Sequence, residues 1–334
     1  MDKTSYKSKY NVKDLKVLYL LNQNARLTAR EIGKLTHTSR EMADYRIKKL
    51  IKTNAINSFH TTISLARLGF SSYNMLLQLE RSSLEDETRL LNFLTNYPLV
   101  RYVVRCRGNW DFNVSFVCKD RVQLSTFIDE LRTFSTILGS EALLIPIKPV
   151  KFDDLWFLSH VSYEYHEPII TLPAKTDAIY HEMLLTLADN ARISLRKLSR
   201  QIKLSPDATY QRFKKLQAMG IIRRFKANLN TERFGLQQYD LYLKIDNYSQ
   251  EEEAHLRTFF KEQKNILRVT RIVGNYDLGL TLLCKDLAEF ESKLEEVRHH
   301  FGKRIKNYIF ALVAKEYKRT SCPSGVFQKK EAIE

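Results

Sequence analysis

The chain has 334 residues, of which 44% are hydrophobic and 11% aromatic, and Lys and Arg outnumber Asp and Glu by 54 to 38. This composition supports folded cores and excludes a disordered polyelectrolyte. The net charge of +16 predicts a polyanionic partner, either nucleic acid or an anionic membrane surface, unless lysine is simply a favoured surface residue here.

No apolar stretch reaches the roughly 18 residues that a membrane-spanning helix needs, and the polar segment 1–14 lacks a signal-peptide pattern. No cysteine belongs to a C-x-x-C pair, and no His or Cys cluster has metal-ligand spacing. The sequence therefore predicts a cytoplasmic protein without a metal, a cofactor or a membrane contact. Its four cysteines are Cys106, Cys118, Cys284 and Cys322.

The chain is an internal repeat with an offset of 166 residues. The stretch "SREMADYRIKKLIKTNAINSF" at 39–59 recurs loosely as "SPDATYQRFKKLQAMGIIRRF" at 205–225. The tetrapeptide "GNWD" at 108–111 recurs as "GNYD" at 274–277. We call the two copies unit 1 and unit 2, and function must be read for each unit.

The first part of unit 1 predicts three helices. Leu15, Leu18 and Leu21 have helical spacing. Thr28 followed three residues later by Glu31 is a capping box, which marks the start of a second helix. A short turn then leads to a third helix. Two short β-like runs follow and are expected to form a small hairpin, which makes the segment a winged helix-turn-helix.

The third helix of each unit has clear ends. Ser39 and Ser205 are N-caps, and in unit 2 Pro206 occupies the first helical position, where its missing N–H does no harm. Asn54 and Gly220 lie just past the helix, where both tolerate the left-handed conformation.

The periodicity of this helix separates a core face from an outward face. Core positions follow i, i+4, i+7 spacing. In unit 1 they are Ala43, Ile47 and Leu50, and in unit 2 Thr209, Phe213 and Leu216. The opposite face carries Glu41, Asp44, Tyr45, Lys48 and Lys52 in unit 1, and Asp207, Tyr210, Gln211, Lys214 and Ala218 in unit 2, with Lys49 and Lys215 at its edge.

This outward face predicts contacts with the major groove of double-stranded DNA. The alternative is an ordinary solvated helix face. The predicted DNA-binding residues are Ser39, Arg40, Asp44, Tyr45, Lys48, Lys49, Lys52, Ser205, Tyr210, Gln211, Lys214, Lys215, Arg223, Arg224 and Lys226.

The two predicted reading domains differ in charge. Residues 30–62 hold seven Lys and Arg against three acidic residues, and residues 196–228 hold ten against one, which gives +4 and +9. Phosphate neutralisation dominates affinity, so unit 2 is expected to bind DNA more strongly. Removing charge at Lys214, Lys215, Arg223 and Arg224 should therefore weaken binding more than removing it at Lys48, Lys49 and Lys52. A further interpretation concerns unit 1 only. Its low charge is compatible with a DNA-binding half that has decayed, which would leave unit 1 as a protein-interaction module.

The second part of each unit changes to a period of two. Strand-like and amphipathic helical segments alternate in the order β-α-β-β-α-β, which is the ferredoxin-like split. Helices cover only one face of such a sheet. The other face must be covered, and an apolar or aromatic face there argues for pairing with another sheet. With two copies in one chain, we expect the sheets of the two units to cover one another.

Taken together, these features resemble the Lrp/AsnC family of transcriptional regulators. The resemblance rests on the winged helix-turn-helix, the βαββαβ domain (the RAM domain of the family) and the G-N-(W/Y)-D turn, and it covers residues 14–148 and 180–316. Most relatives have one unit per chain. The predicted fold is α+β, with two tandem units, each a winged helix-turn-helix followed by a βαββαβ domain. The predicted domains are 10–65 and 177–231 for the winged helices, 69–150 and 235–317 for the RAM-like domains, 151–176 for the linker and 318–334 for a mobile tail.

The resemblance also implies partners. Family members pair through their RAM domains, assemble into larger oligomers, and bind amino acids or related effectors beside the glycine turn. It thus implies an intrachain RAM–RAM pseudo-dimer, with further homo-oligomerisation open. The alternative for the turn residues is a purely conformational role. The implied effector-binding residues are Gly108, Asn109, Asp111, Gly274, Asn275 and Asp277.

The same architecture is similar to sirohaem decarboxylases, and the corresponding strands offer Arg105, Arg107 and Arg271 but no histidine. We expect no enzyme, since the chain has no phosphate-binding glycine loop and no nucleophile elbow.

The linker is rich in aromatic residues, which favours docking on a domain surface over a flexible tether. An aromatic ligand box is the alternative. The aromatic residues are Phe152, Trp156, Phe157, Tyr163 and Tyr165.

Overall fold

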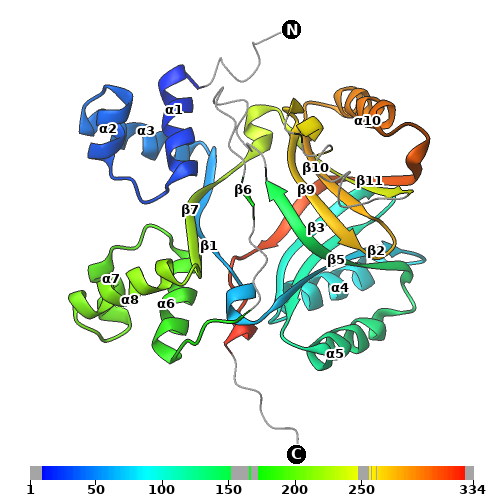
Figure 1. Ribbon diagram of the computed structural model, residues 1–334, viewed down its shortest axis with the longest axis horizontal. Coiled ribbons are helices and arrows are strands. Elements are labelled where there is room, and N and C mark those ends of the chain that lie inside the picture. Colours follow the sequence, from blue (N-terminus) through cyan, green and yellow to red (C-terminus); the bar gives the residue numbers. More distant parts are fainter. Residues whose placement is uncertain are drawn as a thin grey trace, which may run out of the picture.

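Two helical heads lie on one side of the molecule and a large β-structure flanked by helices lies on the other (Figure 1). The computed structural model describes residues 10–151, 165–166, 172–246, 256, 258–260 and 262–327. Among these residues, no helix combines the length and apolar character needed to cross a bilayer.

Each head is built from three helices and one strand. We call them the first head and the second head. The first comprises α1 (Val12–Gln23), α2 (Ala29–Thr36), α3 (Arg40–Lys52) and β1 (Ile56–Ile63). The second comprises α6 (Ala178–Asp189), α7 (Leu195–Gln201), α8 (Pro206–Ala218) and β7 (Ile222–Leu229).

The helix boundaries agree with the capping signals. The Thr28–Glu31 capping box is formed at α2. Ser39 and Ser205 cap α3 and α8 through their side chains, with Pro206 at the first position of α8. Asn54 and Gly220 have positive φ values of 54° and 67°, as expected for residues that close a helix.

The predicted wing hairpins are wrong. Each head contributes one continuous eight-residue strand, and β1 pairs antiparallel with β7 of the other head, for example Phe59 with Ala227. No Gly or Pro interrupts either run, so nothing turns the strand back on itself. The partner strand comes instead from the repeat copy. A two-stranded ribbon therefore joins the heads (Figure 1).

The βαββαβ order is confirmed in unit 1 and along the described part of unit 2. Unit 1 contains β2 (Ser71–Leu79), α4 (Leu84–Asn96), β3 (Val100–Gly108), β4 (Phe112–Cys118), α5 (Arg121–Leu131) and β5 (Leu138–Lys151). Unit 2 contains β8 (Gln237–Ile245), β9 (Ile266–Val273), β10 (Leu278–Cys284), α10 (Leu287–Phe301) and β11 (Ile305–Arg319). The amphipathic pattern of "QEEEAHLRTFFKEQ" at 250–263 also predicts a helix, and most of these residues lie outside the described ones.

The two sheets join into one closed ring. Within unit 1 the order is β5-β2-β4-β3, and within unit 2 it is β11-β8-β10-β9. The units meet at two seams, β3 with β11 and β5 with β9. The sheets thus share edge hydrogen bonds as well as the expected apolar contact between faces. Inside the ring, Leu76 and Trp110 of unit 1 pack with Tyr242 and Tyr276 of unit 2.

Each head packs on the sheet of the other unit. The core of the first head includes Phe234, Leu236 and Leu283 from unit 2. The core of the second head includes Leu99 and Val117 from unit 1. The heads and sheets are therefore interlocked, because neither head completes its core from its own unit.

The predicted mobile tail is also wrong as far as residue 327. β11 ends at Arg319, and Cys322 and Val326 are then buried in the core of the second head. The Gly325 amide donates to the Pro98 carbonyl at 2.9 Å. A Cβ at residue 325 would lie 2.8 Å from the Pro98 side chain, so only glycine fits. The sequence signal was weak, because Pro and Gly are typical of both loose and tightly packed loops.

The linker is described only in part. Phe152, Trp156, Phe157 and Tyr163 lie outside the described residues, and Tyr165 belongs to the short strand β6 (Tyr165–His166), which pairs with the end of β5. At the far end, the Ala174 amide donates to the Arg67 carbonyl at 2.7 Å.

Candidate nucleic-acid interface

The core faces of α3 and α8 are the predicted ones. Ala43, Ile47 and Leu50 are buried in α3, and Thr209, Phe213 and Leu216 are buried in α8. The helical periodicity therefore fixed the orientation of both helices, and their opposite faces point away from the cores.

The outward faces are open to solvent. Tyr45 of α3 is 62% exposed and Tyr210 of α8 is 45% exposed. Neither head buries this face against a sheet. The exposed residues are Ser39, Arg40, Glu41, Tyr45, Lys48 and Lys52 in the first head, and Ser205, Asp207, Gln211, Tyr210, Lys214, Lys215 and Ala218 in the second.

In the first head, a buried carboxylate engages two of the basic side chains. Asp14 of α1 is fully buried, and it forms ion pairs with Arg46 at 2.5 Å and Lys49 at 2.7 Å. Burial by itself raises the pKa of Asp14, but hydrogen bonds from Lys49 and Arg46 outweigh it and lower the pKa below 3.8. The predicted DNA contact Lys49 is therefore bound to its own domain.

Lys48 is also paired, in this case on the surface of α3. It contacts Asp44 at 2.7 Å across one helical turn. Such an exposed pair is weak, and it reduces the positive field that the helix presents. On the outward face of α3, Arg40 and Lys52 are exposed. Among the described residues, neither of them forms an ion pair with a carboxylate.

The second head lacks the buried carboxylate. Tyr180 occupies the position equivalent to Asp14, and Arg212, the equivalent of Arg46, lies 4.7 Å above the Tyr180 ring and pairs with Asp177 at 2.8 Å. Lys215, the equivalent of Lys49, is exposed. Lys214 lies 5.7 Å from the Tyr210 ring.

The basic surface of the second head extends beyond the predicted DNA-binding residues and includes α7. Arg196, Lys197 and Arg200 of α7 are all exposed. They contributed to the predicted charge, yet they were missed as candidate contacts, although "LRKLSRQ" is visibly basic. α2 of the first head has Arg30 and Lys34 in place of these three.

The predicted wing contacts lie on the ribbon between the heads. Arg223 and Arg224 belong to β7, where Arg223 donates to Ser64 at 3.2 Å and Arg224 to Gln23 at 3.3 Å. Lys226 lies on the same strand, opposite His60. All three are half-buried. Their placement follows from the cross-head pairing, so these residues join the heads and do not form a free wing.

A pair of equivalent arginines links the heads. Arg26 donates to the Ala191 carbonyl at 2.7 Å and lies 5.3 Å from the Phe225 ring. Arg192 donates to the Ala25 carbonyl and lies 5.1 Å from the Phe59 ring. Burial lowers the pKa of both guanidinium groups. Each head thus binds the other through the equivalent arginine.

The G-N-(W/Y)-D turns lie at the seams between the units. Gly108 has φ +122°, and a Cβ there would lie 2.8 Å from the Phe310 carbonyl of β11. Gly274 has φ +140°, and a Cβ would lie 2.7 Å from the Leu143 carbonyl of β5. Asn109 and Asn275 are both exposed, and Asn109 Oδ1 accepts from the Phe310 amide at 3.2 Å.

The turn carboxylates are bound within their own units. Asp111 Oδ2 accepts from the Leu79 amide at 2.8 Å. Asp277 Oδ2 accepts from the Ile245 amide at 2.8 Å, and its Oδ1 accepts from Lys244 at 3.0 Å. These bonds fasten each turn to a neighbouring strand. Such a conformational role is the alternative to effector binding for the turn residues.

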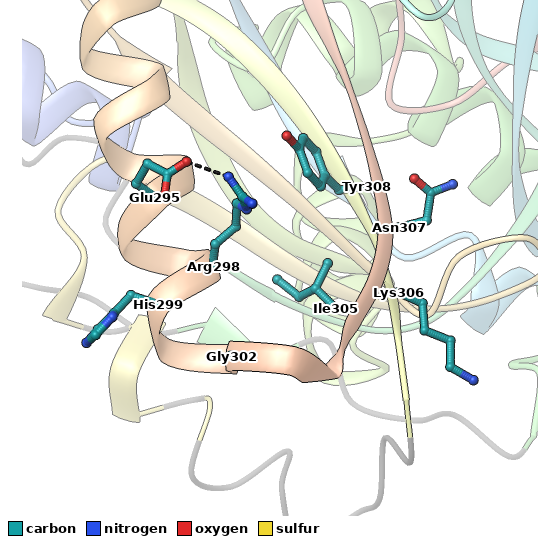
Figure 2. Close-up of a pocket in the computed structure, with 8 residues that line it drawn as sticks. All are labelled: Glu295, Arg298, His299, Gly302, Ile305, Lys306, Asn307 and Tyr308. Atoms are coloured by element: carbon teal, nitrogen blue, oxygen red, sulfur yellow. Dashed lines mark hydrogen bonds and ion pairs between the residues drawn. The ribbon is translucent and has the colours of Figure 1, made fainter.

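A surface pocket lies elsewhere, between the end of α10 and the start of β11 (Figure 2). Arg298 on its wall pairs with Glu295 at 2.6 Å. None of the six predicted effector residues lines it. The lining residues are Glu295, Arg298, His299, Gly302, Ile305, Lys306, Asn307 and Tyr308.

Two heads with exposed recognition helices, each linked to a βαββαβ domain, define a tandem helix-turn-helix DNA-binding protein. The sequence family described as winged helix-turn-helix DNA-binding matches residues 11–57 and 177–223, once in each head.

Curated relatives agree with this class. The HTH-type transcriptional regulator Ptr1 of Methanocaldococcus jannaschii is 32% identical over 117 residues, which is 35% of this chain and 78% of Ptr1. The HTH-type transcriptional regulator LrpB of Bacillus subtilis is 25% identical over 138 residues, 41% of this chain and 89% of LrpB. The chain belongs to the Lrp/AsnC family of transcriptional regulators, in a tandem form.

The similarity to solved structures extends over both units. The sirohaem decarboxylase NirDL, in complex with an iron-uroporphyrin III analogue, aligns with a TM-score of 0.64 at 9% identity and covers 92% of each chain. At this identity the similarity shows a shared fold.

Proposed function

We propose that one chain binds an asymmetric site on double-stranded DNA with both heads, and that the second head supplies most of the affinity. The observation that supports this most directly is the exchange of Asp14 for Tyr180. Asp14 holds Arg46 and Lys49 in the first head, whereas the equivalent Lys215 is exposed in the second. Phosphate contacts dominate affinity, so the two heads contribute unequally.

The arrangement of the heads supports binding as a unit. The β1–β7 ribbon and the Arg26 and Arg192 contacts hold the two heads together. A fixed pair of recognition helices avoids the entropy of ordering two loose domains on DNA. The proposal places the protein with the chromosome, in the cytoplasm of a prokaryotic cell.

The test is a salt-dependent mobility-shift titration on genomic fragments. Replacing both Lys214 and Lys215 by alanine should reduce the slope of log K against log salt by about 2, because each lost phosphate contact lowers it by about 1. Replacing Lys48 and Lys52 should reduce it by about 1, since Lys48 is paired with Asp44. Equal reductions in the two double variants would contradict the unequal contribution of the heads.

An amino-acid effector at the seam stays a prediction from the family. Its support is the position of Gly108 and Gly274 at the junction of the units. A titration of the DNA complex with single amino acids tests it. An effector should change the DNA dissociation constant, and Asn275→Ala should abolish that change without altering binding in the absence of the amino acid.

We further propose that the chain does not catalyse sirohaem decarboxylation. Arg105, one of the arginines that could hold a carboxylated tetrapyrrole, is bound to Glu87 at 2.9 Å and Asp111 at 3.4 Å. Mixing the protein with sirohaem should leave the absorption spectrum unchanged. A shifted band would contradict this part of the proposal.

A further inference from the structure

A buried polar cluster lies inside the closed sheet, around Asp240 of β8. Asp240 is 3% exposed. Its carboxylate accepts hydrogen bonds from Gln238 at 3.1 Å and Thr281 at 3.0 Å, both in unit 2. A third bond comes from Asn113 Nδ2 of unit 1, at 3.2 Å. A buried carboxylate needs such donors, because burial removes the water molecules that would otherwise hydrogen-bond to it.

The bonds of Asn113 cross between the units. Asn113 is in β4 and is 5% exposed. Its amide nitrogen bonds both Asp240 and the hydroxyl of Tyr242, the latter at 3.0 Å. Since β4 and β8 are separated in the ring by β3 and β11, these bonds span the interior and connect the facing sheets.

The repeat does not form a second copy of this cluster at the equivalent positions. The positions equivalent to Asn113, Asp240 and Tyr242 in the other unit hold Gly279, Asn74 and Leu76. A Cβ at residue 279 would lie 2.7 Å from Ile272 Cδ1, so a side chain there would require the end of Ile272 to move. The interior of the ring therefore departs from the pseudo-symmetry of the fold.

The paired arginine contacts between the heads do not make this distinction. Arg26 and Arg192 are equivalent residues that bind equivalent carbonyls, of Ala191 and Ala25. Two copies of the same head could form the same contact. Any preference between like and unlike units must come from residues that differ, as those of the polar cluster do.

We propose that the Asn113–Asp240–Tyr242 cluster makes the sheet of unit 1 select the sheet of unit 2 and disfavour a second copy of itself. Two unit 2 sheets would oppose Asp240 with Gly279, which offers no donor. Two unit 1 sheets would oppose Asn113 with Asn74 and Leu76. Asn74 replaces the Asp240 carboxylate by a neutral amide, and Leu76 offers no acceptor at the place of the Tyr242 hydroxyl. Leaving a buried polar group without its partner disfavours the wrong pair, so each chain presents one head of each kind.

The experiment removes the linker, which otherwise forces unlike pairing. A protease site is placed within residues 152–164 of the full chain, and the folded protein is cut, unfolded in denaturant and refolded. Native mass spectrometry then counts unit 1–unit 2, unit 1–unit 1 and unit 2–unit 2 pairs. Unlike pairs should exceed like pairs at least about tenfold, because each unpaired buried group disfavours a like pair by about that factor.

The double variant Asp240→Asn/Tyr242→Leu gives both sheets the same residues at these two positions. Its unlike pairs should fall towards about half of the total, the value for random pairing. Thr281→Val is the matched control, because Thr281 bonds the same carboxylate from within unit 2, and it should stay as selective as the wild type. If the double variant does not refold, Asn113→Ala removes the cross-unit donor from the other side.

Random pairing in the wild-type protein would overturn the proposal. So would a double variant, or Asn113→Ala, that remains fully selective, because selectivity would then reside elsewhere, such as in the packed segment 320–327. Equal loss of selectivity in Thr281→Val would show that general destabilisation, and no specific cross-unit bond, sets the pairing.

Discussion

At the scale of single residues, Asp14 is the clearest difference between the heads. It is fully buried under α3 and bound by Arg46 and Lys49, whereas Tyr180 stands at the equivalent place and packs against Arg212. One substitution between the repeat copies thus changes both the packing under the recognition helix and the charge that the helix presents.

Replacing Asp14 by alanine should destabilise the first head by about 2–3 kcal/mol, because Arg46 and Lys49 would be left partly buried without a counter-charge. The pKa of Asp14 is lowered on folding, so its stabilising effect is complete above its unfolded pKa of 3.8 and is lost as the pH falls through the lower, folded value. Denaturant unfolding at a series of pH values measures this difference.

Asp44→Ala is the control for that experiment. Asp44 pairs with Lys48 on the open surface of α3, and its loss should change the free energy of unfolding by no more than about 0.5 kcal/mol. A difference between the wild type and Asp14→Ala that persisted unchanged at about pH 2 would show that the ion pairs are not its source.

At the scale of elements, the ribbon of β1 and β7 decides how the heads are held. Each strand would be an unpaired edge in an isolated unit, with open N–H and C=O groups. The repeat supplies the missing partner. Thr61 of β1 adds a bond from its hydroxyl to the Leu187 carbonyl of α6 at 2.6 Å, so strand pairing and helix packing cross the same boundary.

Arg192→Ala should loosen this boundary. It removes a charged hydrogen bond to Ala25 and a contact with the Phe59 ring, which together stabilise by about 2 kcal/mol after the burial of the guanidinium is taken into account. Hydrogen exchange should show faster exchange of β1 and β7 amides, with little change in β8. The exposed Arg200→Ala is the control, and it should leave β1 and β7 protected. Unchanged exchange in Arg192→Ala would contradict a holding role for the arginine.

At the scale of the whole molecule, the interlocked units form a covalent pseudo-dimer. The closed ring lies beside the heads (Figure 1), and each head packs on the sheet of the other unit. A symmetric dimer reads a palindrome with two equal half-sites. This chain presents Tyr45 and Lys52 in one head and Gln211 and Lys215 in the other, so its two half-sites should differ.

Selection of binding sites from random duplexes tests this prediction. The selected sequences should contain two unlike half-sites about one helical turn apart, near 34 Å. Each variant should alter only its own half-site. Tyr45→Ala should relax the preference in one half, and Gln211→Ala should relax it in the other. A perfect palindrome would instead indicate that like heads of two chains bind together.

The sequence alone determined the local features of the molecule. Capping residues placed the starts of α2, α3 and α8, and helical periodicity identified the buried Ala43 and Phe213. These predictions succeeded because caps and amphipathic faces depend on residues within a few positions of one another. The 166-residue repeat likewise gave the two-unit α+β architecture without knowledge of any contact.

Only the tertiary structure decided where each partner comes from. The predicted wings became a shared ribbon, Lys49 became the partner of Asp14, and segment 320–327 became part of a core. Two equivalent copies can satisfy a strand edge or an apolar face within a unit or across units, and the local pattern is the same in both cases. The choice depends on contacts between residues far apart in sequence, such as Asn113 with Asp240, which no periodicity encodes.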